Sequence, residues 1–379
     1  METTGIYIHI PFCISKCPYC SFTSFTPDKV PEEEYVSALL KEIRARYSET
    51  ASSDVRTVYF GGGTPSLISP GGISNILSEL FKKFKLTNPE ITIEANPCTV
   101  DMERLRGYKN SGINRISIGI QSFNDRLLLN LGRTHSSKEA FNAFESARTA
   151  GFDNIGIDLI HSIGGESLQD WKDDLKEAVT LHPEHISAYN LTIEEGTPFH
   201  HSQEKGLLVL PPEEDQTEML LETIEILCAA GYEHYEVSNY ALPGFRSQHN
   251  QIYWKGGDYF GFGVSAHSYY KKGWGVRLAN SPLLTDYLNL INKNGTAVVE
   301  EDILTKEKAM GEVVFLGLRM MEGVNVKDFE QRFGIKIEAV YKDAIEELTT
   351  EELLLYDNDY LKLTRKGLLF SNDVAIRFV

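Results

Sequence analysis

The sequence is sparse in cysteine and contains no long apolar run. Only five cysteines occur in 379 residues, and three of them lie within eight positions, so we expect a metal site in a reducing compartment rather than a disulfide framework. A transmembrane helix needs about 18 consecutive apolar residues, and no such run is present. The first ten residues have neither a basic region nor an apolar core. We therefore expect no signal peptide and a cytoplasmic protein, with peripheral membrane contact left open.

Basic residues are also in short supply. Lys and Arg number 37 against 54 Asp and Glu, which gives a formal net charge of −17. Nucleic acid repels a chain of this charge as a whole, and basic clusters such as Lys82-Lys83 are short. Nucleic acid is therefore not an expected partner. A hydrophobic content of 42% is that of a globular protein with a substantial core.

What the chain does have is a regular alternation of short β-rich runs and amphipathic segments. This order is typical of an α/β fold with a parallel sheet, and six such units predict a partial (β/α)6 TIM-like barrel. The predicted strands are Gly5–Ile10, Thr57–Phe60, Ile91–Glu94, Arg115–Gln121, Asn154–Ile160 and His185–Thr192. The predicted helices are Glu33–Tyr47, Ser74–Phe84, Asp101–Ser111, Lys138–Ala150, Gln169–Leu181 and Glu213–Ala230.

The pattern changes twice along the chain, which predicts three parts. Residues 1–235 form the barrel, and residues 236–300, rich in aromatic residues and glycine, are expected to cover one end of it. Residues 301–379 begin with helices and continue into Leu353–Leu363 and Arg365–Ser371. Helices followed by a β-hairpin suggest a small winged-helix-like α+β domain. Acidic residues outnumber basic ones in this part, so a DNA-binding wing is not expected.

Unusual residues gather where the predicted strands end. In a barrel of this type the active site lies at the C-terminal ends of the strands. The residues found there are the cysteine cluster, Gly61-Gly62-Gly63-Thr64-Pro65, Glu94, Gln121, Asp158 within the fifth strand, and Tyr189 and Asn190. One rim of the barrel is therefore predicted to carry the site.

The cysteine spacing is Cys13-x3-Cys17-x2-Cys20. Three thiolates can hold three irons of a [4Fe–4S] cubane, and the fourth iron then stays open to a small molecule. A structural zinc site would need a fourth Cys or His, and a ferredoxin would supply four cysteines per cluster. His9 is close in sequence but lies on the alternating predicted strand, and neither Cys98 nor Cys228 belongs to a second ligand pair, so both alternatives are less favoured.

The cysteine motif resembles that of the radical S-adenosylmethionine (SAM) superfamily. The chain is most similar to the branch that contains oxygen-independent coproporphyrinogen III dehydrogenase and the haem chaperone HemW. The resemblance covers nearly the whole chain and rests on Gly5–Cys13, Tyr59–Ser66, Glu94–Pro97, Asn114–Phe123, Leu131–His135, Asp158–Ile160, Ser187–Asn190 and Thr364–Gly367. It implies a radical SAM barrel with a [4Fe–4S] cluster and SAM, from which a 5′-deoxyadenosyl radical can form.

The resemblance also implies which residues hold these cofactors. Cys13, Cys17 and Cys20 would ligate the cluster, and Tyr19 would pack near the adenine. The SAM pocket would use Tyr7, Gly62, Gly63, Thr64, Glu94, Gln121, Arg133, Asp158 and Asn190. Glycines allow close approach of the backbone, an arginine can pair with the SAM carboxylate, and the acids can accept from ribose hydroxyls or the ammonium. Each of these residues also has a purely structural alternative. The glycines could form a tight turn, Glu94 and Asp158 could form salt bridges at the strand ends, and Gln121 could be a buried structural amide.

Phe22 separates the two activities of this branch. The dehydrogenase pattern has a fourth Cys two residues after the third, where this chain has Phe22. The dehydrogenase also carries an N-terminal extension, for which the few residues before Cys13 leave no room. Both departures argue against coproporphyrinogen decarboxylation.

The segment Gln248–Trp254 contains HNxxYW, which looks like the haem-binding motif of HemW. It implies a protein that binds haem and delivers it to acceptor proteins, with His249 as an iron ligand and Tyr253 and Trp254 stacked on the porphyrin. The alternative interpretation is a structural loop that seals the barrel. For the whole chain, the alternatives are a radical SAM enzyme of porphyrin biosynthesis, such as the dehydrogenase, and a non-enzymatic iron–sulfur interaction protein.

One segment departs from the family pattern. The family usually has a Pro-Gly-Gln-Thr turn where this chain has Ser162–Ser167. Gly164-Gly165 preserves the turn chemistry, so we expect little functional effect.

Overall fold

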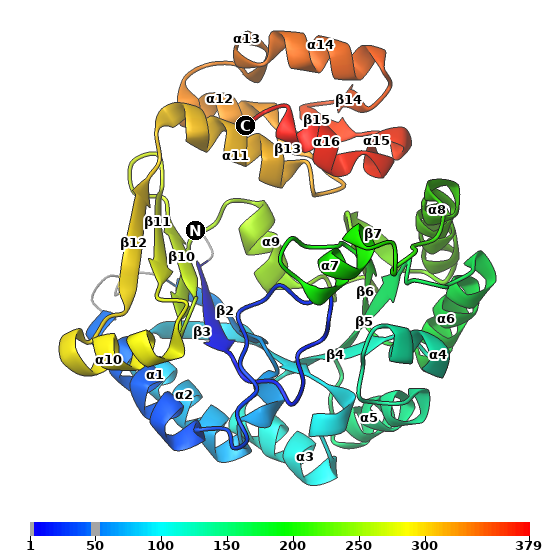
Figure 1. The fold of residues 1–379 in the computed structure, drawn as a ribbon. Helices are drawn as coiled ribbons and strands as arrows, with labels where there is room; N and C mark the ends of the chain where they lie inside the picture. Colours follow the sequence, from blue (N-terminus) through cyan, green and yellow to red (C-terminus); the bar gives the residue numbers. More distant parts are fainter. Residues whose placement is uncertain (1–3, 47–53) are drawn as a thin grey trace.

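The computed structural model describes residues 4–46 and 54–379, and its centre is a sheet of six parallel strands in chain order (Figure 1). This order confirms the predicted α/β barrel core. The predicted first helix ended at Tyr47, which lies outside the described residues. The six strands are β1 (Thr4–Ile10), β2 (Asp54–Gly62), β3 (Lys85–Ala95), β4 (Arg115–Gln121), β5 (Ile155–His161) and β6 (His185–Asn190).

Helices cover the outer face of these strands. They are α1 (Glu32–Arg46), α2 (Pro70–Lys83), α3 (Met102–Ser111), α5 (Ser137–Thr149), α6 (Leu168–Leu181) and α8 (Glu213–Ala229). Local chemistry fixes their ends: Ser136 and Glu139 form a capping box at the start of α5. Gly112 ends α3 with φ +107°, as a glycine past a helix end predicts. Two short helices, α4 (Asp125–Asn130) and α7 (Pro198–Glu204), were not predicted because so few residues show no periodicity.

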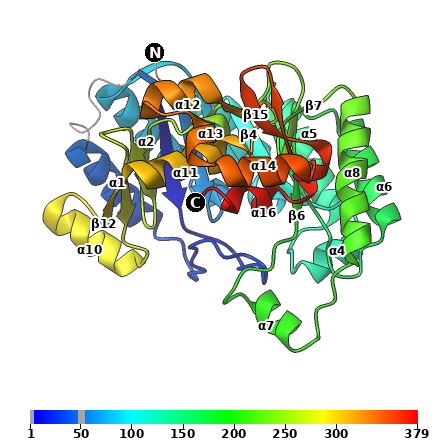
Figure 2. The same cartoon turned by 90° about the horizontal axis from the view of Figure 1, so that it is seen from above.

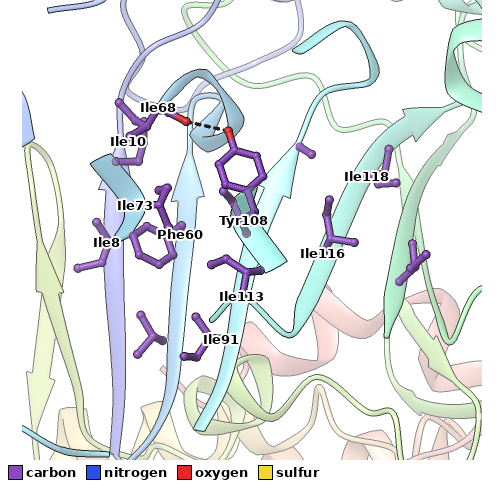
Figure 3. Close-up of a cluster of buried hydrophobic side chains, with 14 of the residues drawn as sticks. Ile8, Ile10, Phe60, Ile68, Ile73, Ile91, Tyr108, Ile113, Ile116 and Ile118 are labelled. Carbon is purple, nitrogen blue, oxygen red and sulfur yellow. Dashed lines mark hydrogen bonds between the residues drawn. The ribbon is translucent and has the colours of Figure 1, made fainter. Parts of the chain in front are cut away.

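Alternation along each strand separates the core from the site. In β1 the side chains of Ile6, Ile8 and Ile10 are fully buried in the main hydrophobic core, whereas Tyr7 is stacked against Tyr59 of the neighbouring strand. Figure 3 shows the apolar layer between the strands and the helices, where the Tyr108 hydroxyl donates to the Ile68 carbonyl at 2.7 Å. Successive side chains point to opposite faces of a strand, so the other face is free to carry polar groups.

Most of the segment expected to cover the barrel instead extends its sheet. Beyond β6 lie β8 (Asn239–Ala241) and β7 (Glu233–Glu236), both antiparallel. Beyond β1 lie β9 (Tyr259–Phe262), which is parallel, and then β10 (His267–Tyr270), β11 (Val276–Asn280) and β12 (Val298–Ile303). Helix α10 (Leu284–Asn294) packs on α1, and α9 (Gln248–Trp254) contacts β1 and β2. The three-part division of the chain stays a prediction.

The C-terminal residues form a second, smaller core around Phe329, Phe333, Leu348 and Leu361. The elements are α11 (Lys306–Gly317), β13 (Val324–Asn325), α12 (Val326–Phe333), α13 (Ile337–Val340), α14 (Lys342–Thr350), the hairpin β14 (Leu354–Asp357) and β15 (Tyr360–Leu363), α15 (Arg365–Leu369) and α16 (Ser371–Ile376). The predicted hairpin is present, but its supposed continuation from Arg365 is helical because the Thr364 hydroxyl caps α15. No helix in the described ranges is both long and apolar enough to cross a membrane.

Glu166 lies in the turn that departs from the family pattern, and its carboxyl is buried. One oxygen accepts from the Ile163 amide at 2.9 Å, and the other has no hydrogen-bond partner. Burial, the largest cause, raises the pKa of this carboxyl from 4.5 to about 8. Between pH 4.5 and 8 the folded protein therefore keeps a proton on Glu166 that the unfolded chain has already released. The free energy of unfolding consequently falls as the pH rises through this range.

Substituting Glu166→Gln, the residue type of the family turn, is expected to remove this pH dependence. The free energy of unfolding should fall less steeply with pH, by up to about 1.4 kcal/mol per pH unit. At pH values above the raised pKa, the variant should be the more stable protein. Urea unfolding of both proteins at several pH values measures the two free energies of unfolding. The difference between their pH dependences is the contribution of the Glu166 carboxyl. Parallel curves would contradict the expectation.

Candidate functional site

A cavity of about 400 Å³ lies at the C-terminal ends of the parallel strands. Its walls come from segments far apart in the sequence, from the loop after β1 to the end of β6. The predicted residues that line it are Cys13, Cys17, Tyr19, Cys20, Gly62, Gly63, Thr64, Glu94, Gln121, Arg133 and Asp158. The fold thus brings most of the predicted cluster and SAM residues to one rim, although their individual roles stay predictions.

The cysteine loop is fixed at several points. The Cys13 amide donates to the Phe25 carbonyl at 2.9 Å, and the Pro18 carbonyl accepts from the Phe199 amide at 3.0 Å. Helix α7, which carries Phe199, therefore lies against this loop, and Figure 2 shows both on the same side of the molecule. The ring of Tyr19 packs against that of Phe199, with centroids 6.1 Å apart. The loop is held in place by its own backbone and by α7.

The three cysteines are partly exposed and free of disulfides. The Thr64 hydroxyl lies 3.5 Å from the Cys13 sulfur, and an Arg133 nitrogen lies 3.5 Å from the Cys17 sulfur. Within the described ranges no three Cys, His, Asp or Glu side chains stand close enough to share a single metal ion. The thiolates of a cubane bind three different irons and are more widely spaced. The soft three-thiolate donor set, with a cation beside it, therefore fits a [4Fe–4S] cluster better than a closed zinc site.

Bare backbone forms the wall beside the cysteines. Gly62 has φ +112°, and a Cβ atom there would lie 2.5 Å from the His9 ring. At Gly63 a Cβ atom would lie 2.8 Å from the Phe12 carbonyl oxygen. Only glycine fits the positive φ at Gly62 and the lack of space for a Cβ atom at both positions. The result is a stretch of backbone that a ligand can approach closely.

Two carboxylates lie deeper in the cavity. Glu94 accepts from the Tyr59 hydroxyl at 2.8 Å and from the Gly62 amide at 3.1 Å. Burial, the largest cause, and repulsion from Asp158 raise the pKa of Glu94 to about 7, although the bonds from Tyr59 and Gly62 lower it. Asp158 accepts from the Ser117 hydroxyl at 3.2 Å, and burial raises its pKa as well. This acidic pocket suits a ligand with hydroxyls and a positive charge.

Arg133 supplies a positive charge to the same cavity. Its guanidinium donates to the Gly119 carbonyl at 3.0 Å and approaches Cys17, while its Nε has no hydrogen-bond partner. An arginine with an unused donor beside the cysteines can bind a carboxylate. The cavity therefore offers separate places for the positive and negative ends of an amino acid group.

Sequence reasoning did not select all of the cavity residues. Ser117, Gly119 and Tyr189 also line it. A signal for two of them was available, because Ser117, Gly119 and Gln121 are spaced two apart on β4 and so share one face. Tyr189 was placed near the strand end but was not assigned a role.

Five predicted residues lie outside this cavity. Tyr7 lies beneath it, with its hydroxyl 3.1 Å from His9 Nδ1, and Asn190 is exposed at the end of β6. The other three, His249, Tyr253 and Trp254, belong to α9 at the opposite end of the barrel. There the His249 Nδ1 lies 2.7 Å from the Thr57 hydroxyl and its Nε2 lies 2.8 Å from the Tyr253 hydroxyl. In this arrangement α9 packs against β1 and β2, and its haem-binding role stays a prediction.

The comparisons with known proteins agree on one family. Residues 7–178 match the Radical SAM superfamily, and residues 304–370 match the HemN C-terminal domain. The chain is 35% identical to the heme chaperone HemW of Bacillus subtilis, with 98% of both chains covered. It is 36% identical to HemW of Lactococcus lactis, with 100% of this chain and 98% of that one covered.

A solved structure extends the likeness to the whole fold. Coproporphyrinogen III oxidase (HemN) from Escherichia coli has a TM-score of 0.85 and 24% identity, with 100% of this chain and 90% of that chain covered. This likeness concerns the fold alone. The near full-length identity to the HemW proteins shows that the chain belongs to the HemW family of radical SAM proteins, whose superfamily uses a [4Fe–4S] cluster and SAM.

Proposed function

We propose that this protein binds haem and delivers it to haem-requiring acceptor proteins in the cytoplasm. The observation that carries the proposal is the similarity to heme chaperones over nearly the whole chain, at 35% and 36% identity. The cysteines would hold the cluster, and SAM would bind in the neighbouring cavity.

Phe22 supports a chaperone rather than a dehydrogenase. Its side chain is 66% exposed and lies in the wall of the cluster cavity. A phenyl ring can neither ligate iron nor transfer a proton, so it cannot replace the fourth cysteine of the dehydrogenase pattern. The exposed ring adds apolar surface to the cavity wall.

The residues of the cavity would bind and orient SAM. The backbone at Gly62 and Gly63 would approach the methionine group, Arg133 would pair with the carboxylate, and Glu94 and Asp158 would accept from the ammonium or the ribose hydroxyls. A reduced [4Fe–4S] cluster supplies the electron with which radical SAM proteins cleave SAM. Because the pKa of Glu94 is about 7, its carboxyl can be neutral or ionised near neutral pH and can match the charge of the ligand group beside it.

Anaerobic cluster reconstitution, followed by SAM and haem titration of the same sample, tests the proposal. Binding of both ligands without consumption of coproporphyrinogen III is the expected result. The dehydrogenase alternative predicts multiple turnovers of 5′-deoxyadenosine linked to loss of the porphyrinogen, and that outcome would overturn the proposal. An iron–sulfur interaction protein would bind neither SAM nor haem.

Substituting His249→Ala is expected to weaken haem binding by at least about tenfold, or about 1.4 kcal/mol. Burial and the nearby Arg115 lower the pKa of His249 to about 3, so its ring is neutral, the form that binds iron. Both ring nitrogens are hydrogen-bonded, so ligation would require α9 to release one of these bonds. Haem titration monitored by absorbance measures the effect, with the exposed His201→Ala on α7 as the control. Equal affinities would remove His249 from the haem site.

A further inference from the structure

Gln121 ends β4 in a backbone conformation that residues other than glycine rarely adopt. Its φ is +71°, in the left-handed region where a Cβ atom is crowded. The pairing of β4 with β5 shifts register between Gly119 and Gln121. Bulges and strained residues re-aim side chains at functional sites, and strain persists only where the surrounding structure imposes it. The residues that impose this conformation therefore bear on the cluster cavity.

The Gln121 side chain lies against Gly119 inside that cavity. A Cβ atom at Gly119 would lie 2.8 Å from the Gln121 amide nitrogen and 3.5 Å from an Arg133 nitrogen. All three residues line the cavity, and the Gly119 carbonyl accepts from Arg133 at 3.0 Å. The amide and the guanidinium thus share the bare backbone of β4. A change of the backbone at Gln121 would move its amide away from this place.

Asp174, on α6, fixes the residues that follow Gln121. Its two carboxylate oxygens accept from the Ser122 hydroxyl at 2.5 Å and from the Phe123 amide at 2.9 Å. The Ser122 oxygen in turn accepts from the Asn124 amide at 3.0 Å. The side chains of Ser122 and Asp174 are both buried. One helix on the outer face of the sheet therefore holds the loop that leaves β4.

The Asp174 carboxyl is ionised at neutral pH although it is buried. Burial, the largest cause, raises its pKa from 3.8 to about 6, while the bonds from Ser122 and Phe123 lower it. An ionised carboxylate accepts at both oxygens, and hydrogen bonds to a charged acceptor are stronger than neutral ones. The charge of Asp174 therefore strengthens its hold on the loop.

The residue before Gln121 is held as well. The Ile120 carbonyl lies 2.9 Å from Nε2 of the buried His135. A carbonyl oxygen only accepts, so this ring nitrogen is the donor. Gln121 thus has a fixed neighbour on each side. Its backbone cannot relax to an ordinary strand conformation without loss of a buried hydrogen bond, which is costly.

We propose that Asp174 is a positioning residue for the cluster cavity, which acts by holding Gln121 in its strained conformation. The inference rests on the proposed binding of SAM in this cavity. Asp174 does not itself line the cavity. Its effect on SAM would therefore pass through the loop that it holds.

The SAM affinity of an Asp174→Ala variant tests the inference. After anaerobic cluster reconstitution, equilibrium dialysis is expected to show at least about fivefold weaker SAM binding, because two buried bonds are lost. Iron content should equal that of the wild type, since the cysteines belong to another loop. Asp174→Asn keeps an acceptor for the Phe123 amide and gains an amide that can donate to the Ser122 oxygen. It should restore the affinity to within about twofold.

Thr223→Ala is the matched control. It removes another buried bond of α6, in which Trp171 Nε1 donates to the Thr223 hydroxyl at 2.9 Å, and neither residue lines the cavity. This variant should bind SAM within about twofold of the wild type, because distant sites act independently. Circular dichroism checks that each variant folds.

A double-mutant cycle with Gln121→Ala separates positioning from a general loss of structure. In the Gln121→Ala background, Asp174→Ala should weaken SAM binding by no more than about twofold further, because the two residues act as a unit. Equal effects of Asp174→Ala in both backgrounds would overturn the inference, as would wild-type affinity of Asp174→Ala alone. If Asp174→Ala does not fold, Ser122→Ala removes one of the two bonds and replaces it in the cycle. Absence of SAM binding by the wild type would instead contradict the proposed function.

Discussion

Substituting Cys17→Ala is expected to abolish assembly of the [4Fe–4S] cluster, and SAM binding with it. Each of the three cysteines would hold one iron, and no other cysteine lines the cavity to replace the lost thiolate. Without the cluster, the amino and carboxylate groups of SAM lose the iron that they chelate in this superfamily. Iron content and the visible charge-transfer absorbance after reconstitution measure the first effect, and equilibrium dialysis with SAM measures the second.

Cys228→Ala is the matched control for this substitution. Cys228 is an exposed cysteine on α8 and is not part of the cavity wall, so this variant should load iron and SAM as the wild type does. Full loading of the Cys17→Ala variant would show that the cysteine triad is not the cluster site.

Substituting Arg46→Met is expected to cost about 3–5 kcal/mol of folding free energy. Arg46 and Glu42 form an ion pair at 3.1 Å in which both side chains are almost completely buried. Glu42 also accepts from the Gly263 amide at 2.9 Å and from the Tyr287 hydroxyl at 2.8 Å. Removal of Arg46 would leave the Glu42 carboxylate buried without this counter-ion. Denaturant unfolding measures the loss.

Arg44→Met provides the exposed counterpart on the same helix. Arg44 pairs with Glu79 at 3.0 Å, but its side chain is 53% exposed, and pairs of this kind contribute about 0–1 kcal/mol. A similar cost for both variants would contradict the assignment of Arg46 as a buried structural charge. The comparison also tests how α1 is attached to the extra strands, because Arg46 donates to the Gly261 carbonyl of β9 at 2.9 Å.

The parallel core was predictable because its signals are local. Each strand of the barrel carries its own alternation, as in Ile6, Ile8 and Ile10 of β1, and the glycine after α3 marks a helix end. Strands and loops were expected in Tyr232–Tyr270, but their place at the edge of the sheet was not, because β9 to β12 are short and pair with partners that only the closed fold brings near, such as β9 with β1. Helix α9 was missed because seven residues make only about two turns.

The sequence by itself predicted the cluster site, because its three cysteines lie within eight positions and one loop can present them together. It also determined that polar residues meet at the C-terminal rim, because parallel strands all end on the same side. Only the tertiary structure decided that the HNxxYW helix lies at the other end. That position depends on the bond between His249 and Thr57, which are 192 residues apart, and on packing of α9 against α11. Contacts over such a separation are set by packing of the whole chain, and no local pattern records them.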